Sequence, residues 1–329
     1  MSELHKFLFD GLPVRGMVVR LTDAWVEILR RRASNTTSGA YAQPVAEMLG
    51  EMTAAAALMQ SNIKFDGSLV LQIFGDGPVK VAVVEVNPDL ALRATATVTE
   101  PVAPSTSLSM MVNAHNQGRC AITLDPKTKF PGQQPYQGVV PLFDDHGKPI
   151  HKLSEVLEHY MLQSEQLDTT LVLAANAEVA AGLLIQRLPL EGAGNLAGSM
   201  VSKENEDEIG LNEHYNRIAT LAGSLKREEL LTLDVETILR RLFWEEQVTR
   251  FEPMVGESAP KFSCNCSRER VAKMIVALGA EEAEEILAER GEIEVACEFC
   301  GVQYRFDPID AAQLFTQAMQ HVQVGNERH

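Results

Sequence analysis

Hydrophobic and polar positions alternate with a period of two over several stretches of the first half of the chain. Such alternation is typical of strands that bury one face. We expect these strands at Arg15–Leu21, Ser68–Phe74, Val79–Val86 and Leu90–Thr97. Only Gly75-Asp76-Gly77-Pro78 and Asn87-Pro88-Asp89 separate the last three, and both segments have turn chemistry. These three strands therefore predict a meander.

Other stretches have the spacing of helices. Thr22 or Asp23 is expected to cap a short helix that runs to about Arg32. Ala42–Gln60 predicts a longer, largely buried helix. A third helix is predicted at Ser154–Ser164, capped by its serine. Further strands are expected at Arg119–Leu124, Tyr136–Leu142, Thr169–Ala175 and Ala181–Arg187. Strands grouped in hairpins, with helices between the groups, predict an α+β fold and not a doubly wound sheet.

The composition of the chain changes near Pro189 and suggests four regions. Residues 1–189 are expected to form an N-terminal domain of mixed helices and sheet. Residues 190–251 begin with a glycine-rich acidic segment and continue as an amphipathic helical linker, with apolar positions from Ile218 to Leu242 at helical spacing. Residues 252–308 are predicted to form a small cysteine-bearing domain, and residues 309–329 a helical tail.

The net charge of the chain limits the classes of partner that we expect. The 329 residues include 29 Lys and Arg against 45 Asp and Glu, a net charge of -16. Nucleic acids and anionic membranes bind clustered basic residues, so neither is an expected partner. Charges at Glu3, Lys6 and Asp10 interrupt the N-terminal apolar positions, and no stretch has the pattern of a signal peptide or a membrane span. The cytoplasm is the expected location, where thiols are kept reduced.

Four of the five cysteines lie in the predicted small domain as two close pairs. Cys264-Asn265-Cys266 is followed after thirty residues by Cys297-Glu298-Phe299-Cys300, and Gly301 comes next. Two such pairs far apart in sequence are the usual way to build a tetrahedral zinc–thiolate site. No His or other Cys lies between the pairs, so the expected ligands of one Zn²⁺ are Cys264, Cys266, Cys297 and Cys300. Four protein ligands leave no open position for catalysis.

The surrounding residues predict a compact zinc module. Strands at Ile293–Ala296 and Val302–Phe306 would place the second pair at a hairpin tip, and helices are expected at Arg268–Leu278, capped by Ser267, and at Glu281–Arg290. We expect Arg268 and Arg270 to offset the negative charge of the thiolates. A module of about fifty residues gains only ~3–5 kcal/mol from its core. Structural zinc contributes an apparent ~10–16 kcal/mol, so zinc should decide whether the module folds.

Oxidation would act on the same sulfurs. Each pair is close enough in sequence for a disulfide of its own, Cys264 with Cys266 and Cys297 with Cys300. Zinc keeps the sulfurs as reactive thiolates, whereas a disulfide sulfur is a poor zinc ligand. Oxidation is therefore expected to expel the metal and unfold the module. The alternative is a structural zinc-ribbon interaction module that does not switch.

The cysteine segments and several upstream segments together resemble the redox-regulated heat-shock protein 33 family of chaperones. The resemblance covers the chain from about Arg15 to Asp307. The segments that carry it are Phe262-Ser263-Cys264-Asn265-Cys266-Ser267-Arg268-Glu269-Arg270, Ile286-Leu287-Ala288-Glu289, Gly291-Glu292-Ile293-Glu294, Tyr136-Gln137-Gly138-Val139-Val140 and Ser164-Glu165-Gln166-Leu167. The departure from the family pattern is the long acidic insertion around Gly192–Gly210.

The resemblance implies an ATP-independent holdase and not an enzyme. In such a protein the reduced, zinc-bound form is inactive, and oxidation forms the two local disulfides and releases zinc. The cysteine module and adjoining linker then unfold, apolar surface is exposed, the protein dimerises, and unfolding client proteins are held against aggregation under oxidative stress. The amphipathic stripe from Ile218 to Leu242 would cover apolar surface of the N-terminal domain until it is released.

Two other functions compete with this interpretation. A zinc ribbon that binds nucleic acid needs a basic face, but the module is rich in glutamate between Glu281 and Glu298. A thiol oxidoreductase would need Cys297 and Cys300 at the start of a helix, whereas a glycine and a strand are expected there. No phosphate-binding loop is present, in keeping with ATP independence. Cys120 begins an apolar strand and is expected to be a buried, inert thiol.

Overall fold

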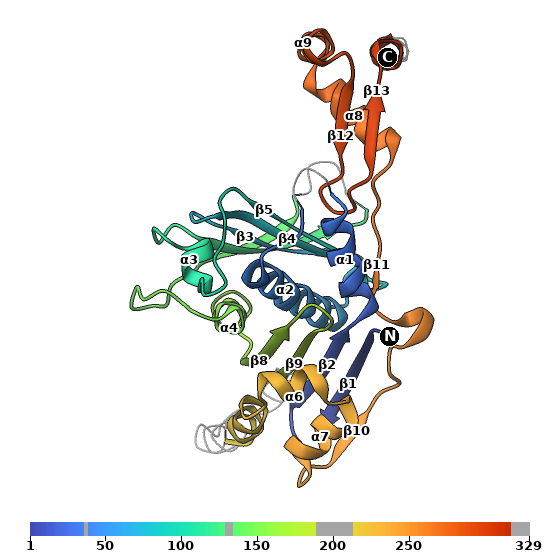
Figure 1. Cartoon of the computed structure of the whole chain (residues 1–329). Coiled ribbons are helices and arrows are strands. Elements are labelled where there is room, and N and C mark those ends of the chain that lie inside the picture. The colour runs from blue at the N-terminus through green and yellow to red at the C-terminus, as the bar shows by residue number, and fades with distance from the viewer. Residues whose placement is uncertain (36–38, 129–133, 189–212, 317–329) are drawn as a thin grey trace, which may run out of the picture. The chain divides into compact units, whose positions relative to one another are not determined.

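The structure is a computed structural model that describes residues 1–35, 39–128, 134–188 and 213–316 (Figure 1). The chain divides into two compact units, the first covering Met1–Ser263 and the second Cys264–His329. The first unit contains two sheets and the helices around them, and the second contains helices and one hairpin. The fold is therefore α+β, as the grouping of strands predicts.

One sheet of the first unit has five strands in the order β10-β1-β2-β9-β8, all antiparallel to their neighbours. Its strands are β1 (Glu3–Phe9), β2 (Val14–Leu21), β8 (Thr169–Ala175), β9 (Ala180–Arg187) and β10 (Val248–Arg250). Strand β9 is buried along nearly its whole length because both faces of this sheet are covered. Strand β1 was not expected, because charges at Glu3, Lys6 and Asp10 interrupt its apolar positions and its pairing with β2 defines it.

The other sheet has six strands in the order β11-β5-β4-β3-β6-β7. Its strands are β3 (Gly67–Phe74), β4 (Val79–Val86), β5 (Ala91–Val98), β6 (Arg119–Pro126), β7 (Tyr136–Pro141) and β11 (Lys261–Phe262). Strands β3, β4 and β5 pair in succession, which confirms the predicted meander. The short edge strand β11 runs parallel to β5 and immediately precedes Ser263.

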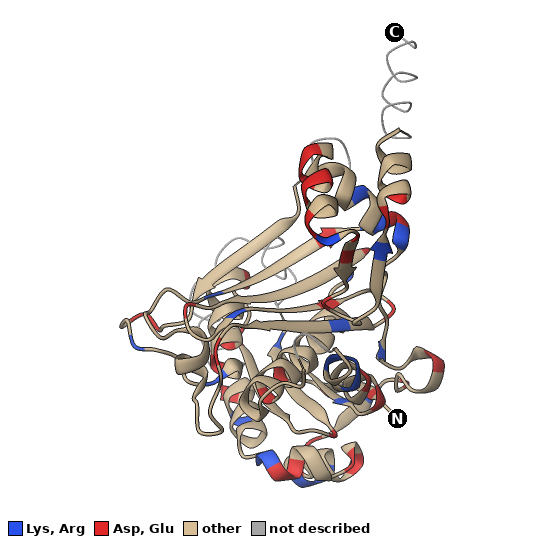
Figure 2. Ribbon diagram, turned by 45° about the horizontal axis from the view of Figure 1, so that its top comes forward, with Lys and Arg blue, Asp and Glu red and all other residues tan. Residues whose placement is uncertain are grey.

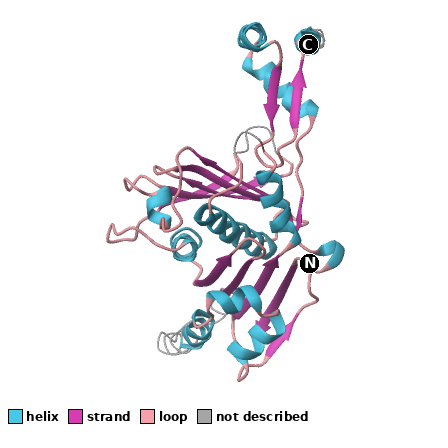
Figure 3. Cartoon of the chain, viewed as in Figure 1, coloured by secondary structure: helices cyan, strands magenta, loops and turns pink. Residues whose placement is uncertain are grey.

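Helix α2 (Gln43–Asn62) lies between the two sheets (Figures 1 and 3) and is their shared core. Its Ala, Leu and Met side chains are buried because a helix between two sheets presents an apolar surface all round. Helices α1 (Asp23–Ala33), α3 (Leu108–Val112) and α4 (Leu153–Glu165) also belong to the first unit. The predicted serine cap of α4 is wrong: Lys152 is the N-cap residue, and its side chain makes no capping bond.

The outer face of the five-stranded sheet is covered by the helical residues of the predicted linker. A helix at 213–223, α6 (Arg227–Thr232) and α7 (Val235–Phe243) provide this cover. Phe243 packs edge-to-face on Phe9 with ring centroids 5.0 Å apart, and Ile218, Ile238 and Leu242 are buried in the same apolar cluster. The predicted packing of this amphipathic stripe on the N-terminal domain is thus confirmed.

Arginine side chains fasten the covering helices to the rest of the unit. Arg20 of β2 donates to the backbone oxygens of Leu230 at 2.6 Å and Leu231 at 3.1 Å. Arg227 of α6 forms ion pairs with Glu47 at 3.0 Å and Glu51 at 3.6 Å, both on α2. The cover is therefore held by polar contacts at its edge as well as by apolar burial.

The second unit contains α8 (Arg268–Leu278), α9 (Ala280–Arg290), the antiparallel hairpin of β12 (Ile293–Ala296) and β13 (Gln303–Phe306), and a helix at 308–316. The boundary between the units lies after Ser263, whereas the sequence analysis began the cysteine domain at residue 252. Residues 252–263 pack with the first unit because Met254 bridges Leu4 and β11 pairs with β5. The glycine-rich acidic segment up to residue 212 and the tail from residue 317 lie outside the described residues.

Glu51 makes the stability of the first unit depend on pH. Burial raises its pKa from 4.5 to about 7, although Arg227 opposes the shift. The folded state therefore holds the proton more tightly than the unfolded chain, so stability is lost as pH rises from 4.5 through 7. At pH 8 we expect Glu51→Gln to have a free energy of unfolding about 1–2 kcal/mol higher than that of the unchanged protein. This value is reduced for residual solvent screening. Near pH 4.5 we expect the two proteins to be equally stable.

Urea unfolding followed by tryptophan fluorescence measures this difference, because both tryptophans, Trp25 and Trp244, belong to the first unit. Glu27→Gln is the control. Hydrogen bonds from Arg30 and Arg31 lower the pKa of Glu27 to about 2, so removing this carboxylate should give no gain in stability at pH 8. Equal stability of Glu51→Gln and the unchanged protein at pH 8 would refute this account of Glu51.

Candidate metal centre

Two local structures of the second unit carry the four paired cysteines. Cys264 and Cys266 lie in the extended segment that leads into α8, which begins where the Ser267 side chain accepts a hydrogen bond from the Arg270 backbone at 3.3 Å. Cys297 and Cys300 lie in the turn between β12 and β13, so the predicted hairpin tip is confirmed. Residues distant in sequence thus reach one place through a helix start and a hairpin turn.

The turn between β12 and β13 has the geometry of a knuckle. The Cys297 backbone N–H donates to the Val302 oxygen at 2.9 Å, and the Gly301 N–H donates to the Cys297 oxygen at 2.8 Å. Gly301 has a φ of 72°, a left-handed conformation that favours glycine. The turn therefore directs both of its cysteines to one side of the hairpin tip.

The four sulfurs lie within 4.8 Å of one another. Cys264 Sγ is 3.6 Å from Cys297 Sγ, and Cys266 Sγ is 3.2 Å from Cys300 Sγ. A tetrahedral zinc site with Zn–S bonds of about 2.3 Å separates its sulfurs by roughly 3.8 Å. The arrangement fits a single metal ion with four thiolate ligands. Within the described residues, no other group of His, Cys, Asp or Glu side chains gathers three or more ligand atoms in this way.

The thiols differ in their electrostatic surroundings. Burial raises the pKa of Cys300, with a backbone hydrogen bond at Val302 opposing it, and burial raises the pKa of Cys297 against backbone hydrogen bonds at Cys300 and Phe299. Burial also favours a higher pKa for Cys266, but hydrogen bonds from Tyr304 and the neighbouring thiols lower this pKa to about 7. Cys266 is thus the sulfur whose protein surroundings most favour the thiolate among these three.

Tyr304 is a site residue that the sequence analysis missed. Its hydroxyl donates to Cys266 Sγ at 3.1 Å, and this bond raises the pKa of Tyr304 to about 12. The sequence does contain a feature that points to Tyr304. Tyr304 and the buried Phe306 are two residues apart on a predicted strand, so their side chains lie on the same face. Donors to ligand atoms outside the ligand set tune metal affinity, so Tyr304 belongs to the site.

Of the two arginines expected to offset the thiolate charge, Arg268 is directed to other partners, and for Arg270 the expectation stays a prediction. The Arg268 guanidinium donates to Asp310 and to the Arg305 oxygen, both at 2.7 Å, and lies 4.2 Å from the centre of the Phe306 ring. These contacts fix the start of α8 against β13 and the helix at 308–316. Arg268 therefore has a structural role here, and the donor at the sulfurs is Tyr304.

The apolar core around this site is small. Its buried members are Ile275, Ala283, Ile293, Phe306 and Ala311. The acidic side chains of α9 give the unit a negatively charged helix (Figure 2), which does not suit nucleic acid. So small a core supplies only a few kcal/mol, and a metal bound by four thiolates would add the larger share of the stability.

The fifth cysteine, Cys120, is not part of the cluster. It is fully buried on β6 in the first unit, and burial raises its pKa to about 12. The prediction that Cys120 is buried is confirmed. A thiol with a raised pKa stays protonated at neutral pH, in keeping with the inertness that we expect of it. No helix in the described ranges has both the length and the apolar character needed to cross a membrane.

Comparisons with known proteins agree with this architecture. A curated relative from Chromobacterium violaceum, named 33 kDa chaperonin, is 44% identical over 95% of this chain and 94% of its own. Another of the same name, from Methylobacillus flagellatus, is 39% identical over 100% of this chain and 99% of its own. The crystal structure of a 33 kDa chaperonin (heat shock protein 33 homolog) from Thermotoga maritima matches the fold with a TM-score of 0.70 at 20% identity, over 97% of this chain and 99% of that one.

A sequence profile described as Hsp33 protein matches residues 2–307, which include both sheets, the covering helices and all four clustered cysteines. The match is thus not confined to the cysteine segments. Together with relatives at 39–44% identity over nearly their whole lengths, it shows that this chain belongs to the Hsp33 family.

Proposed function

We propose that this protein is an ATP-independent holdase chaperone of the cytoplasm, non-enzymatic, and switched on by oxidation of its four clustered cysteines. The observation that carries the proposal is the convergence of four thiols within 4.8 Å in a unit with a small apolar core. Family membership and relatives named 33 kDa chaperonin support the chaperone role. The switching and its consequences are our inference.

Cys264, Cys266, Cys297 and Cys300 would hold one Zn²⁺ in the reduced protein. When bound, zinc supplies the positive charge that keeps four adjacent sulfurs deprotonated. The donor set fits, because an all-thiolate tetrahedral arrangement is typical of structural zinc. The Tyr304 hydroxyl and the backbone of the turn would stabilise the sulfurs in this state.

Oxidation by a peroxide such as H₂O₂ would remove the ligands in pairs. One thiolate of a pair attacks a peroxide oxygen, the O–O bond breaks, and a sulfenic acid and hydroxide form. The second thiolate attacks the sulfenic sulfur, the S–O bond breaks, a disulfide forms and a second hydroxide leaves. Each pair loses two electrons, and the two hydroxides become water by taking up protons. The proposed pairs, Cys264 with Cys266 and Cys297 with Cys300, no longer provide thiolates for the metal.

The segment before Cys264 provides a physical route from this loss to the first unit. Ser263 donates to the Leu92 oxygen at 3.0 Å and Lys261 donates to the Leu90 oxygen at 3.1 Å, so β11 holds the chain on the edge of one sheet. Earlier in the chain, the Met254 backbone N–H donates to the Leu4 oxygen at 2.8 Å, and the Leu4 N–H donates to the Met254 oxygen at 3.1 Å. Strand β10, which precedes Met254, lies on the edge of the other sheet. Short edge strands are weakly held, so unfolding that starts at Cys264 can spread along them.

The surface exposed by this spread would bind clients. Removing α6 and α7 uncovers the outer face of the five-stranded sheet, where Phe7, Phe9, Val14 and Val18 are buried in the closed state. The apolar side of α7 becomes free at the same time. Exposed apolar patches of this kind bind other apolar surfaces, whether of unfolding client proteins or of a second copy in the active homodimer.

Peroxide treatment of the reduced, zinc-loaded chain under mild heat tests the proposal. We expect one zinc ion per chain to be released, ANS fluorescence to rise, and aggregation of a heat-unfolding reporter enzyme to be suppressed, all with one time course. A chelating dye, ANS and light scattering measure the three signals. A reductant with added zinc should reverse them.

Cys120→Ala is the control, since the buried thiol takes no part in the switch and all three signals should persist. Cys297→Ser should lose zinc and suppress aggregation without peroxide, because three thiolates bind zinc less tightly than four. Zinc release without suppression of aggregation would contradict the proposal and leave a structural zinc-ribbon interaction module. Turnover of an external disulfide would point to an oxidoreductase.

The role of Tyr304 gives a separate prediction. Tyr304→Phe removes the hydroxyl from Cys266 Sγ and keeps the ring, so we expect zinc affinity to fall about tenfold. Without this donor the Cys266 thiolate is also a stronger nucleophile, and oxidation of the Cys264–Cys266 pair should become faster. Chelator competition measures the affinity, and timed alkylation with mass spectrometry follows each cysteine pair.

The Cys297–Cys300 pair is an internal control, because the Tyr304 hydroxyl donates to Cys266 and the backbone hydrogen bonds at Cys297 and Cys300 survive the substitution. Tyr136→Phe is the matched control, since the Tyr136 hydroxyl donates to Glu165 at 3.2 Å in the first unit. Unchanged zinc affinity together with unchanged oxidation of Cys264 and Cys266 in Tyr304→Phe would refute the assigned role.

A further inference from the structure

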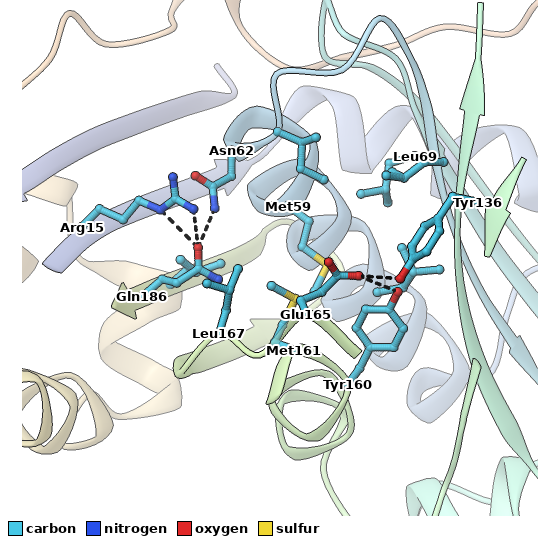
Figure 4. A pocket seen from close by; sticks show the side chains of 14 residues that line it. Arg15, Met59, Asn62, Leu69, Tyr136, Tyr160, Met161, Glu165, Leu167 and Gln186 are labelled. Carbon is cyan, nitrogen blue, oxygen red and sulfur yellow. Dashed lines mark hydrogen bonds between the residues drawn. The ribbon is translucent and has the colours of Figure 1, made fainter. Parts of the chain in front are cut away.

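The first unit contains a pocket that has no part in the proposed switch. It lies between the two sheets where α2 and α4 end and has a volume of about 160 Å³ (Figure 4). Strands β2 and β9 of one sheet and β3, β6 and β7 of the other contribute to its lining. We call it the inter-sheet pocket.

The walls of the inter-sheet pocket are mainly apolar. Met59, Leu69, Ile122, Met161 and Leu184 line it, and all but Met161 are buried. A cavity of about 150 Å³ with apolar walls accepts a benzene ring. The inter-sheet pocket therefore has room for one ring or one branched chain, and its two methionines can adjust to the shape of the guest.

One end of the pocket has more hydrogen-bond donors than acceptors. Arg15 donates through Nε at 3.1 Å and through Nη2 to a single oxygen, Gln186 Oε1, which also accepts from Asn62 Nδ2 at 2.9 Å (Figure 4). The Gln186 amide group is fully buried and donates onward to Thr169 Oγ1 at 2.7 Å. Donors on Arg15 and Asn62 are thus left for an acceptor that the pocket itself does not provide.

The charge at this end is also uncompensated. In the described part of the chain, Arg15 forms no ion pair with a carboxylate, and neither does Lys6, whose pKa is lowered by burial and by the nearby Arg15. Burial lowers the pKa of Arg15 as well. Buried charges in proteins are normally paired, so the half-buried Arg15 guanidinium at this end of the pocket favours an anion. Lys6 lies outside the pocket lining and donates to the Ser61 backbone oxygen, and it adds positive charge near Arg15.

The opposite end of the inter-sheet pocket has a negatively charged hydrogen-bond acceptor. Glu165 accepts hydrogen bonds from the Tyr136 hydroxyl at 3.2 Å and the Tyr160 hydroxyl at 3.3 Å (Figure 4). Glu165 and Tyr136 are exposed, so this end reaches solvent. A carboxylate here repels a second negative charge on the ligand. The pocket thus distinguishes an anionic end from an uncharged one.

We propose that the inter-sheet pocket binds a small monocarboxylate that carries one ring-sized apolar group. Arg15 and Asn62 hold the carboxylate through the donors that Gln186 leaves free. The apolar group lies between Met59, Met161 and Leu184. The proposal is independent of the cysteine site, because every lining residue belongs to the first unit.

Hydrocinnamate, a phenyl ring on a three-carbon acid, is the probe. It is added to the full-length, reduced, zinc-loaded protein with methionine methyl groups labelled with ¹³C. We expect the methyl signals of Met59 and Met161 to shift with a common saturation curve. Those of Met110, an exposed residue outside the pocket lining, and of Met274 in the second unit should stay unchanged.

A ligand series on the unchanged protein tests the charge preference without any mutation. The amide of hydrocinnamate should bind at least tenfold more weakly, because it lacks the charge-assisted bonds to Arg15. 3-(4-Carboxyphenyl)propanoate, which has the same ring and a second carboxylate at the far end of that ring, should also bind more weakly, since Glu165 repels it. Acetate at the same concentration should not shift either methyl signal.

Arg15→Met removes the guanidinium and keeps an apolar stem, so the preference for the acid over the amide should collapse while weak amide binding remains. Arg119→Met, which replaces an exposed arginine of β6 outside the pocket, should retain the preference. Equal binding of acid and amide, or unshifted Met59 and Met161 signals, would overturn the proposal. Binding of a peptide with C-terminal Phe but not of hydrocinnamate would overturn it in favour of a chain terminus.

Discussion

Four sulfurs within 4.8 Å of one another cannot all be thiolates unless a cation lies among them. Two unit charges about 4 Å apart repel by about 4 kcal/mol at an effective dielectric constant of 20, and the cluster contains several such pairs. Burial raises the pKa values of Cys297 and Cys300 as well, which adds to the cost of ionising these two thiols. The second unit has five buried apolar residues in its core, too few to compensate. We therefore propose that its fold depends on a cation that neutralises the sulfurs, and that this dependence would make it responsive to oxidants.

The two units owe their stability to different sources, and the difference allows one to unfold without the other. The first unit has an extensive core of two sheets around α2, which loses nothing when a thiol is oxidised. Its covering helices, however, are joined to Cys264 through β10, Met254 and β11, all of them short edge contacts. In the proposed switch, a local change at the sulfurs would therefore free an apolar face while the sheets stay folded. The arrangement suits a protein that must present apolar surface only on demand.

Much of this architecture could be predicted from the sequence, because it follows from local patterns. The meander, α2, α8 with its Ser267 cap and the cysteine hairpin depend on periodicity, turn residues and ligand spacing, all of which are visible in sequence. Apart from the serine cap of α4, which is a local feature, the failures concern contacts between distant residues. Strand β1 is specified by pairing with β2, and residues 252–263 join the first unit because β11 pairs with β5. The contacts of Arg268 with Asp310 and of Tyr304 with Cys266 require the fold of the second unit, which spacing along the chain does not contain.

The central claim is that the metal, and not the apolar core, holds the second unit folded. Hydrogen–deuterium exchange of the full-length reduced protein, before and after zinc is removed by a chelator in the presence of reductant, tests it without forming any disulfide. We expect the amides of α8, β12 and β13 to lose protection while those of β3 and β9 remain protected. Protection of β12 and β13 that survives the removal of zinc would contradict the account.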